Sequence, residues 1–113
     1  MDSYKTGIFS EILACAFLML HGFRIVQRRY TTGRHTGRAE IDIIAKRGNL
    51  IVFIEVKKRK TITAALDAIT WTQIRRLRAA AETYLLKKRW MGDARFDVII
   101  VYGHHIEWIK QAF

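Results

Sequence analysis

Three acidic residues and one lysine in the middle of the chain have the types and spacing of a metal-dependent hydrolytic site. Glu40, Asp42 and Glu55 are the only acids between residues 24 and 60, a stretch that holds eleven lysines and arginines. Two carboxylates with water and a backbone carbonyl suit a hard cation such as Mg²⁺ or Mn²⁺. Lys57 could stabilise negative charge on a phosphate, or help to position or deprotonate an attacking water.

A two-residue turn predicts how these side chains meet. Gly48-Asn49 stands between two runs rich in isoleucine and valine, which is typical of a β-hairpin. With the turn there, Asp42 lies opposite Glu55 and Glu40 lies opposite Lys57, all on one face of the sheet. Opposed carboxylates repel each other, and a divalent cation reverses the sign of that interaction. The other face would then pack into the core through Ile41, Ile43, Ile54 and Val56.

The same residues also have structural interpretations. Glu40 and Glu55 could simply neutralise neighbouring arginines and lysines, because structural ion pairs are common. Glu11 lies among small and apolar residues of the first predicted helix, so it is either exposed in the first turns or directed into the metal cluster. Gln73 could hydrogen-bond to water or phosphate at the site, or be an ordinary residue beside the apolar stripe of its helix.

Hydrophobic periodicity predicts the elements that position these residues. Apolar residues recur at helical spacing near the N-terminus and after residue 64, and β-branched runs lie between and after these segments. We expect an α/β fold with a mixed sheet flanked by helices. The expected helices are residues 3–21 and 64–89, and the expected strands are residues 23–30, 38–46, 50–58, 96–102 and 105–109.

Composition narrows the class of protein. A chain of 113 residues with 50% hydrophobic residues fits one folded domain, residues 1–113. Its net charge of +10 favours a polyanionic partner, most often nucleic acid, although charge can also serve solubility alone. The longest apolar run, residues 12–20, is too short for a membrane span, and no signal-peptide cleavage pattern is visible, so we expect a cytoplasmic protein without membrane contact. The histidines and the single cysteine lack zinc-ligand spacing, and we take packing as the default role of the three tryptophans, with base stacking as the alternative.

Residues 7–113 resemble the YraN-like uncharacterised protein family, small bacterial proteins with a predicted restriction-endonuclease-like fold of the PD-(D/E)xK class. The Asp followed by Glu-x-Lys is also shared with archaeal Holliday-junction resolvases, which resemble this family in fold. The resemblance rests on the order and spacing of short segments: Gly7 with Glu11, His21-Gly22-Phe23, Glu40-Ile41-Asp42-Ile43-Ile44, Val52-Phe53-Ile54-Glu55-Val56-Lys57, Arg75-Arg76-Leu77 and Arg95-Phe96-Asp97-Val98.

The resemblance implies a fold core of order α-β-β-β-α-β and a role for each site residue. Asp42 and Glu55 would be ligands of Mg²⁺ or Mn²⁺, with the backbone carbonyl of Val56 as a further ligand. Lys57 would be the catalytic lysine, and Glu11 the helical acid of the same site. The usual helical lysine of the family aligns with a different residue here, Gln73, and resolvase-like nucleases can carry glutamine on the corresponding helix.

These observations predict a metal-dependent endonuclease that hydrolyses phosphodiester bonds in DNA, including branched or damaged structures. RNA stays open as a substrate, and a homodimer is plausible for so small a domain. The alternatives are a non-catalytic nucleic-acid-binding module with the same fold, and an interaction subunit that needs a partner to cut. We expect phosphate contacts from Lys58, Arg59, Lys60, Arg28, Arg29, Arg34 and Arg38.

Overall fold

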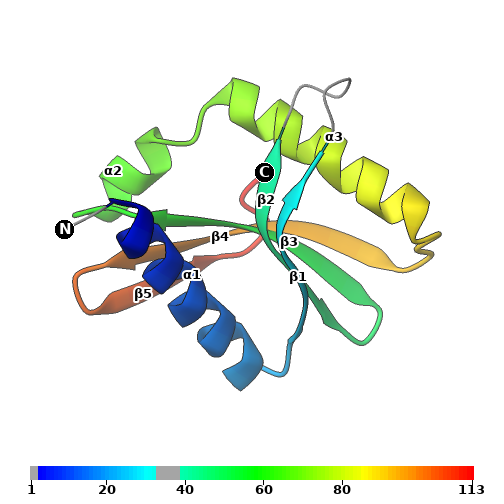
Figure 1. Ribbon diagram of the computed structural model, residues 1–113, viewed down its shortest axis with the longest axis horizontal. Coiled ribbons are helices and arrows are strands. Elements are labelled where there is room, and N and C mark those ends of the chain that lie inside the picture. Colours follow the sequence, from blue (N-terminus) through cyan, green and yellow to red (C-terminus); the bar gives the residue numbers. More distant parts are fainter. Residues whose placement is uncertain (1–2, 33–38) are drawn as a thin grey trace.

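Five strands form one mixed sheet with helices on both of its faces (Figure 1). The computed structural model describes residues 3–32 and 39–113, with side chains from Gly7 onward. The strands lie in chain order across the sheet, and every neighbouring pair is antiparallel except β3 and β4, which are parallel. The elements are α1 (Ser3–Leu20), β1 (Arg24–Thr31), β2 (Glu40–Arg47), β3 (Leu50–Lys58), α2 (Ile62–Asp67), α3 (Trp71–Lys87), β4 (Asp93–Tyr102) and β5 (His105–Ile109).

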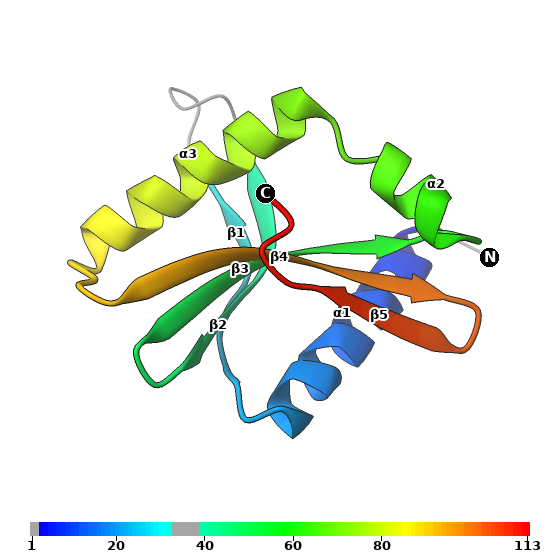
Figure 2. The ribbon, with the colours of Figure 1, turned by 180° about the vertical axis from the view of Figure 1, so that it is seen from behind.

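The sheet separates the core into two layers, each covered by helices. Figure 2 shows α1 on one side of the sheet and α2 and α3 on the other. Leu18 of α1 packs with Ile43 and Ile54, whereas Leu77 of α3 packs with Ile44 and Phe53. Ala65 of α2 packs against the β4 residues Val98 and Ile100 on the α3 side. Both faces of the central strands are therefore buried, which explains their nearly continuous apolar sequences.

The fold class predicted from the sequence is confirmed. The order is α-β-β-β-α-α-β-β, so the expected core order is present with one added helix and a fifth strand. Strand β3 has the predicted bounds, and β4 begins three residues earlier than predicted. No helix in the described part of the chain is long and apolar enough to span a membrane.

The prediction of one long helix over residues 64–89 is wrong, because the chain breaks between α2 and α3. Thr61 caps α2 and accepts a hydrogen bond from the backbone N–H of Ala64 at 3.0 Å. Thr70 caps α3 in the same way, and its hydroxyl accepts from the N–H of Gln73 at 3.1 Å. The backbone of Thr70 is extended, so the chain changes direction there and α3 begins as a separate helix. The first residues of α3 then line a pocket together with residues of the sheet.

A second prediction that the structure corrects concerns Ile41. We expected it on the same face as Ile43, Ile54 and Val56, but it packs with the cluster under α3, whereas the other three belong to the cluster under α1. The last backbone pair between β2 and β3 joins Ile43 to Ile54. Ile41 lies beyond that pair, where the regular alternation of a hairpin no longer fixes its surroundings.

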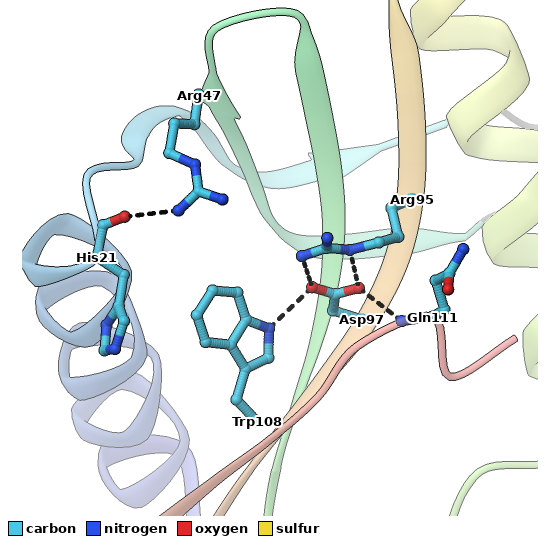
Figure 3. Close-up of polar contacts among 6 residues, drawn as sticks. All are labelled: His21, Arg47, Arg95, Asp97, Trp108 and Gln111. Atoms are coloured by element: carbon cyan, nitrogen blue, oxygen red, sulfur yellow. Dashed lines mark hydrogen bonds and ion pairs between the residues drawn. The ribbon is translucent and has the colours of Figure 1, made fainter.

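A buried carboxylate joins the C-terminal residues to β4 (Figure 3). Asp97 is fully buried and forms two hydrogen bonds of 2.9 Å with the guanidinium group of Arg95. It also accepts from the indole N–H of Trp108 at 2.8 Å and from the backbone N–H of Gln111 at 3.0 Å. Four donors therefore compensate the cost of burying this charge, and they fix β5 and the residues after it.

Candidate active site

The polar residues singled out in the hairpin line one pocket of about 540 Å³ between the sheet and the first turn of α3. It lies where β2 and β3 continue beyond their last backbone pair, Ile43 with Ile54. The predicted hairpin register is confirmed from that pair to the turn. Gly48 adopts a φ of +59° in the turn, a conformation that suits glycine. The polar residues that line the pocket include Glu40, Asp42, Glu55, Lys57, Gln73 and Arg76.

The side chain of Asp42 links β2 to β3 beyond the point where their backbone pairing ends. Its Oδ2 accepts a hydrogen bond of 2.8 Å from the backbone N–H of Val56. The N–H and C=O groups of one strand residue point to the same edge of the strand, so the Val56 carbonyl also lies on the Asp42 side of β3. Asp42 therefore stays beside Glu55 although the backbone ladder ends one residue earlier.

Glu55 is the most constrained acid of the pocket, with 6% of its surface exposed. Its Oε1 atom lies 3.1 Å from the Nζ atom of Lys57 and accepts a hydrogen bond of 3.1 Å from Nε2 of Gln73. Its Oε2 atom is buried, and no group of the described residues donates to it. A buried carboxylate oxygen without a donor is costly, so this atom favours either a bound proton or a cation.

The protonation of the two acids reflects their proximity. Burial and the neighbouring Glu55 raise the pKa of Asp42 from 3.8 to about 8, although the Val56 N–H favours the charged form. Burial also raises the pKa of Glu55, and Lys57 and Gln73 oppose that shift. The site therefore favours either a bound proton or a cation over two free negative charges.

Glu11 lies near this pair but has a partner of its own. It is 9% exposed, which is inconsistent with the interpretation of a solvated acid in the first turns of α1. Its Oε1 atom lies 3.2 Å from Nε of Arg29, and its charge contributes to the raised pKa of Asp42. Arg29 has a φ of +53°, an unfavourable backbone conformation for arginine. Glu11 therefore influences the acid pair electrostatically without lining the pocket.

The residues present fit a divalent cation held mainly by two carboxylates. Within residues 3–32 and 39–113, no three Asp, Glu, His or Cys side chains are grouped closely enough to hold a metal ion. Mg²⁺ is usually bound through one or two carboxylates and keeps several waters. Asp42 and Glu55 provide such a pair, and the unpartnered Oε2 atom of Glu55 is the observation that supports the fit.

The start of α3 adds groups to the pocket that the sequence analysis did not assign. Thr70, Thr72 and Arg76 line it, together with Gln73. A helix N-terminus carries partial positive charge, which favours anions such as a phosphate. The sequence Thr70-Trp71-Thr72-Gln73 matches the helix-capping pattern Thr-x-x-Gln, so a helix start here could have been recognised.

The residues expected to contact phosphates differ in their surroundings. Arg28 is exposed on β1, and Arg29 is half-buried against Glu11. Arg34 and Arg38 lie outside the described residues. Exposed cations stand at the end of β3 and directly after it, leading away from the pocket: Lys58, Arg59 and Lys60.

Comparison with known proteins gives a consistent family relationship. Residues 10–101 match the model of the uncharacterised protein family UPF0102. The chain is 43% identical over 101 residues to a UPF0102 protein of Mesorhizobium japonicum, covering 88% of the chain and 78% of that protein. It is 44% identical over 101 residues to a UPF0102 protein of Brucella canis, covering 88% and 77%. It is 40% identical over 111 residues to one of Bartonella bacilliformis, covering 93% and 88%.

Proposed function

The chain belongs to the uncharacterised protein family UPF0102, the YraN-like family that its sequence resembles, and we propose that it is a divalent-metal-dependent endonuclease acting on DNA. The single observation that carries this proposal is the buried Oε2 atom of Glu55, which has no donor among the described residues and lies beside a second acid, the half-buried Asp42. Burying two adjacent carboxylates is unfavourable unless a cation or a proton compensates them.

In this proposal Asp42, Glu55 and the backbone carbonyl of Val56 hold Mg²⁺ or Mn²⁺. A divalent ion bound there would supply Lewis-acid stabilisation of the phosphoryl oxygens and lower the pKa of a coordinated water. Lys57 lies 3.1 Å from Glu55, so its ammonium group is held next to the place where negative charge develops. Gln73 fixes the other side of the same carboxylate oxygen, which orients Glu55 toward the pocket.

The surface around the pocket supports a polyanionic substrate. Arg76 and the first turn of α3 line the pocket opposite the acids, where they can receive a phosphate. Lys58, Arg59 and Lys60 are exposed where β3 leaves the pocket. With a net charge of +10, the protein attracts a nucleic-acid backbone more strongly than a neutral small molecule.

The test is cleavage of linear, nicked, damaged and four-way-junction DNA, and of RNA, with Mg²⁺ or Mn²⁺ and with a chelator. We expect cleavage by the wild type, and a loss of about a hundredfold or more in Asp42→Asn, Glu55→Gln and Lys57→Met, since each removes a group acting on the transition state. Asp93→Asn is the matched control because Asp93 is exposed on β4. Equal cleavage by the wild type and Asp42→Asn on every substrate would refute the proposal.

A non-catalytic nucleic-acid-binding module is the second candidate. The observation that favours it is the absence of a group of three acidic, histidine or cysteine side chains among the described residues. This candidate predicts binding that weakens with salt and does not change when a chelator is added. Binding with those properties, together with no cleavage of any substrate, would replace the endonuclease proposal.

A further inference from the structure

A second pocket, of about 250 Å³, lies at the C-terminal end of α3, and we propose that it holds an unpaired nucleotide of the bound nucleic acid. The proposal rests on the proposed function for the class of ligand, and it deepens that function by naming a substrate feature, a single-stranded segment. The residues on which the argument depends are the cations Arg24, Lys46 and Lys88 and the aromatic residues Tyr84 and Trp90.

The charges around this second pocket have one sign. Arg24 begins β1, Lys46 lies near the end of β2, and Lys88 follows the last turn of α3. The residues that line the pocket include no acid, and the ion pairs found within the described residues involve other cations. Three cations that have no acidic partner in the described part of the chain form a site for phosphate groups, which arginine and lysine side chains commonly bind.

Two aromatic rings lie beside two of these cations. The Nζ atom of Lys46 lies 4.8 Å from the centre of the Trp90 ring, and that of Lys88 lies 5.7 Å from the centre of the Tyr84 ring. Trp90 is half-buried and can offer part of its ring to a base, whereas Tyr84 is only 3% exposed and belongs to the wall of the pocket. An aromatic ring next to cations is the combination that single-stranded nucleic acids bind, because the ring stacks on a base while the cations contact phosphates. The composition of the pocket therefore matches a nucleotide better than a simple anion.

The indole ring of Trp90 is held in place before any ligand binds. Its N–H donates a hydrogen bond of 2.9 Å to the backbone carbonyl of Asp93. Gly92 allows this arrangement, since a Cβ atom there would lie 2.6 Å from the Cζ2 atom of Trp90 and would also overlap Asn49. A ring that is already fixed loses little conformational entropy when a base stacks on it.

The two pockets are aligned along one helix. Both lie between α3 and the strands β2 and β3, the first near Gln73 and the second near Lys88. The 15 residue steps from Gln73 to Lys88 correspond to about 22 Å of helix, roughly six or seven nucleotides at the spacing of a stacked strand. Bases inside a duplex are stacked on each other and do not offer a free face. The second pocket therefore favours nucleic acids with a single-stranded tail, flap or junction arm.

The test is fluorescence anisotropy, in the presence of a chelator, of three labelled ligands. These are a blunt duplex, the same duplex with a single-stranded tail, and the tailed duplex with abasic residues in the tail. Trp90→Leu should bind the tailed duplex about tenfold more weakly than the wild type and bind the blunt duplex equally well. The wild type should bind the abasic tail as weakly as Trp90→Leu binds the normal tail.

Controls separate stacking from folding and from catalysis. Phe9→Leu is the matched control, because Phe9 is an aromatic residue that is 59% exposed on α1 and lines neither pocket. Lys46→Gln and Lys88→Gln should each lower the salt dependence of binding by about one phosphate contact. If Trp90→Leu does not fold, Trp90→Phe, which keeps a ring, should retain tail binding, and the abasic ligand tests the proposal on the wild type.

Two results would overturn this inference. One is unchanged affinity of the wild type for the abasic tail, and the other is an equal loss on tailed and blunt duplexes in Trp90→Leu. Because no metal is present in the binding assay, a failure of the protein to cleave nucleic acid does not affect the binding result. Tail-specific binding without cleavage would keep the pocket and reject the catalytic role of Asp42.

Discussion

The Oδ2 atom of Asp42 accepts a hydrogen bond of 2.8 Å from the backbone N–H of Val56 on the adjacent strand. This bond replaces the backbone pairing that ends at Ile43 and Ile54. The bond holds Asp42 next to Val56, the residue that follows Glu55. Strands β2 and β3 can therefore stop pairing and leave room for a pocket while Asp42 and Glu55 stay close together. The same bond favours the charged form of Asp42 and partly opposes the effect of burial on its pKa.

A first prediction is that Mg²⁺ or Mn²⁺ stabilises the folded protein. A cation that binds only the folded state at about a hundred times its Kd adds about 2.7 kcal/mol to the free energy of unfolding. The melting temperature of the wild type should therefore rise with added metal in a thermal-shift assay, whereas Asp42→Asn and Glu55→Gln should show no rise. The exposed Asp93→Asn control should respond like the wild type. A similar rise in all four proteins would place the metal elsewhere.

A second prediction concerns pH in the absence of metal. The pKa of Asp42 is about 8 in the folded protein and 3.8 in its ordinary state, so folding holds a proton that the unfolded chain releases. Stability from this group is present at low pH and is lost as the pH rises through about 8. The free energy of unfolding, measured with urea and a chelator, should therefore fall as the pH rises between these two pKa values, 3.8 and about 8. Asp42→Asn should have a shallower pH dependence, and an unchanged slope would argue against the raised pKa.

A third prediction tests Gln73 as a positioning residue. Gln73→Ala leaves Glu55 Oε1 with Lys57 as its remaining described partner, so cleavage should fall about tenfold, as for other groups that orient metal ligands. Gln73→Lys can still donate to that oxygen and should retain most of the activity. A higher metal concentration should partly rescue Gln73→Ala, which a purely structural role would not explain. Gln27→Ala, an exposed change on β1, is the matched control.

A fourth prediction concerns Asp97 and stability. Asp97→Ala leaves the half-buried Arg95 guanidinium without its carboxylate and removes the acceptor of Trp108, so unfolding should be easier by about 3–5 kcal/mol. Asp97→Asn keeps an acceptor and should cost less. Urea unfolding measures both variants against Asp93→Asn. A loss below about 1 kcal/mol in Asp97→Ala would show that these hydrogen bonds add little to stability.

The sequence contained enough local information to predict the hairpin and its acids. A two-residue turn and alternating side chains set the register from Gly48-Asn49 back to Ile43, so the polar cluster followed from the spacing of Asp42 and Glu55. The bounds of β3 and β5 also followed from their apolar runs. These features depend on neighbours that are close in the chain, which is why a single sequence was sufficient.

Features that depend on how distant elements meet were not predictable in the same way. The ion pair between Glu11 and Arg29 joins α1 to β1, and the position of Arg76 in the pocket depends on the angle at which α3 lies on the sheet. The break before Thr70 was missed because apolar and small residues continue through it, and the capping pattern was the only local signal. Sequence spacing defines faces of single elements, whereas tertiary packing selects which faces come together.

The parallel pairing of β3 with β4 has a consequence for the order of folding. The hairpin of β2 and β3 closes a short loop and is expected to form early, while its acids are still hydrated. The parallel pairing of β3 with β4 requires the crossover through α2 and α3, and the docking of α3 on the sheet brings Gln73 to Glu55. We therefore expect the docking of α3 to be the step that dehydrates the two carboxylates. Refolding should consequently be slowest under conditions in which both remain ionised.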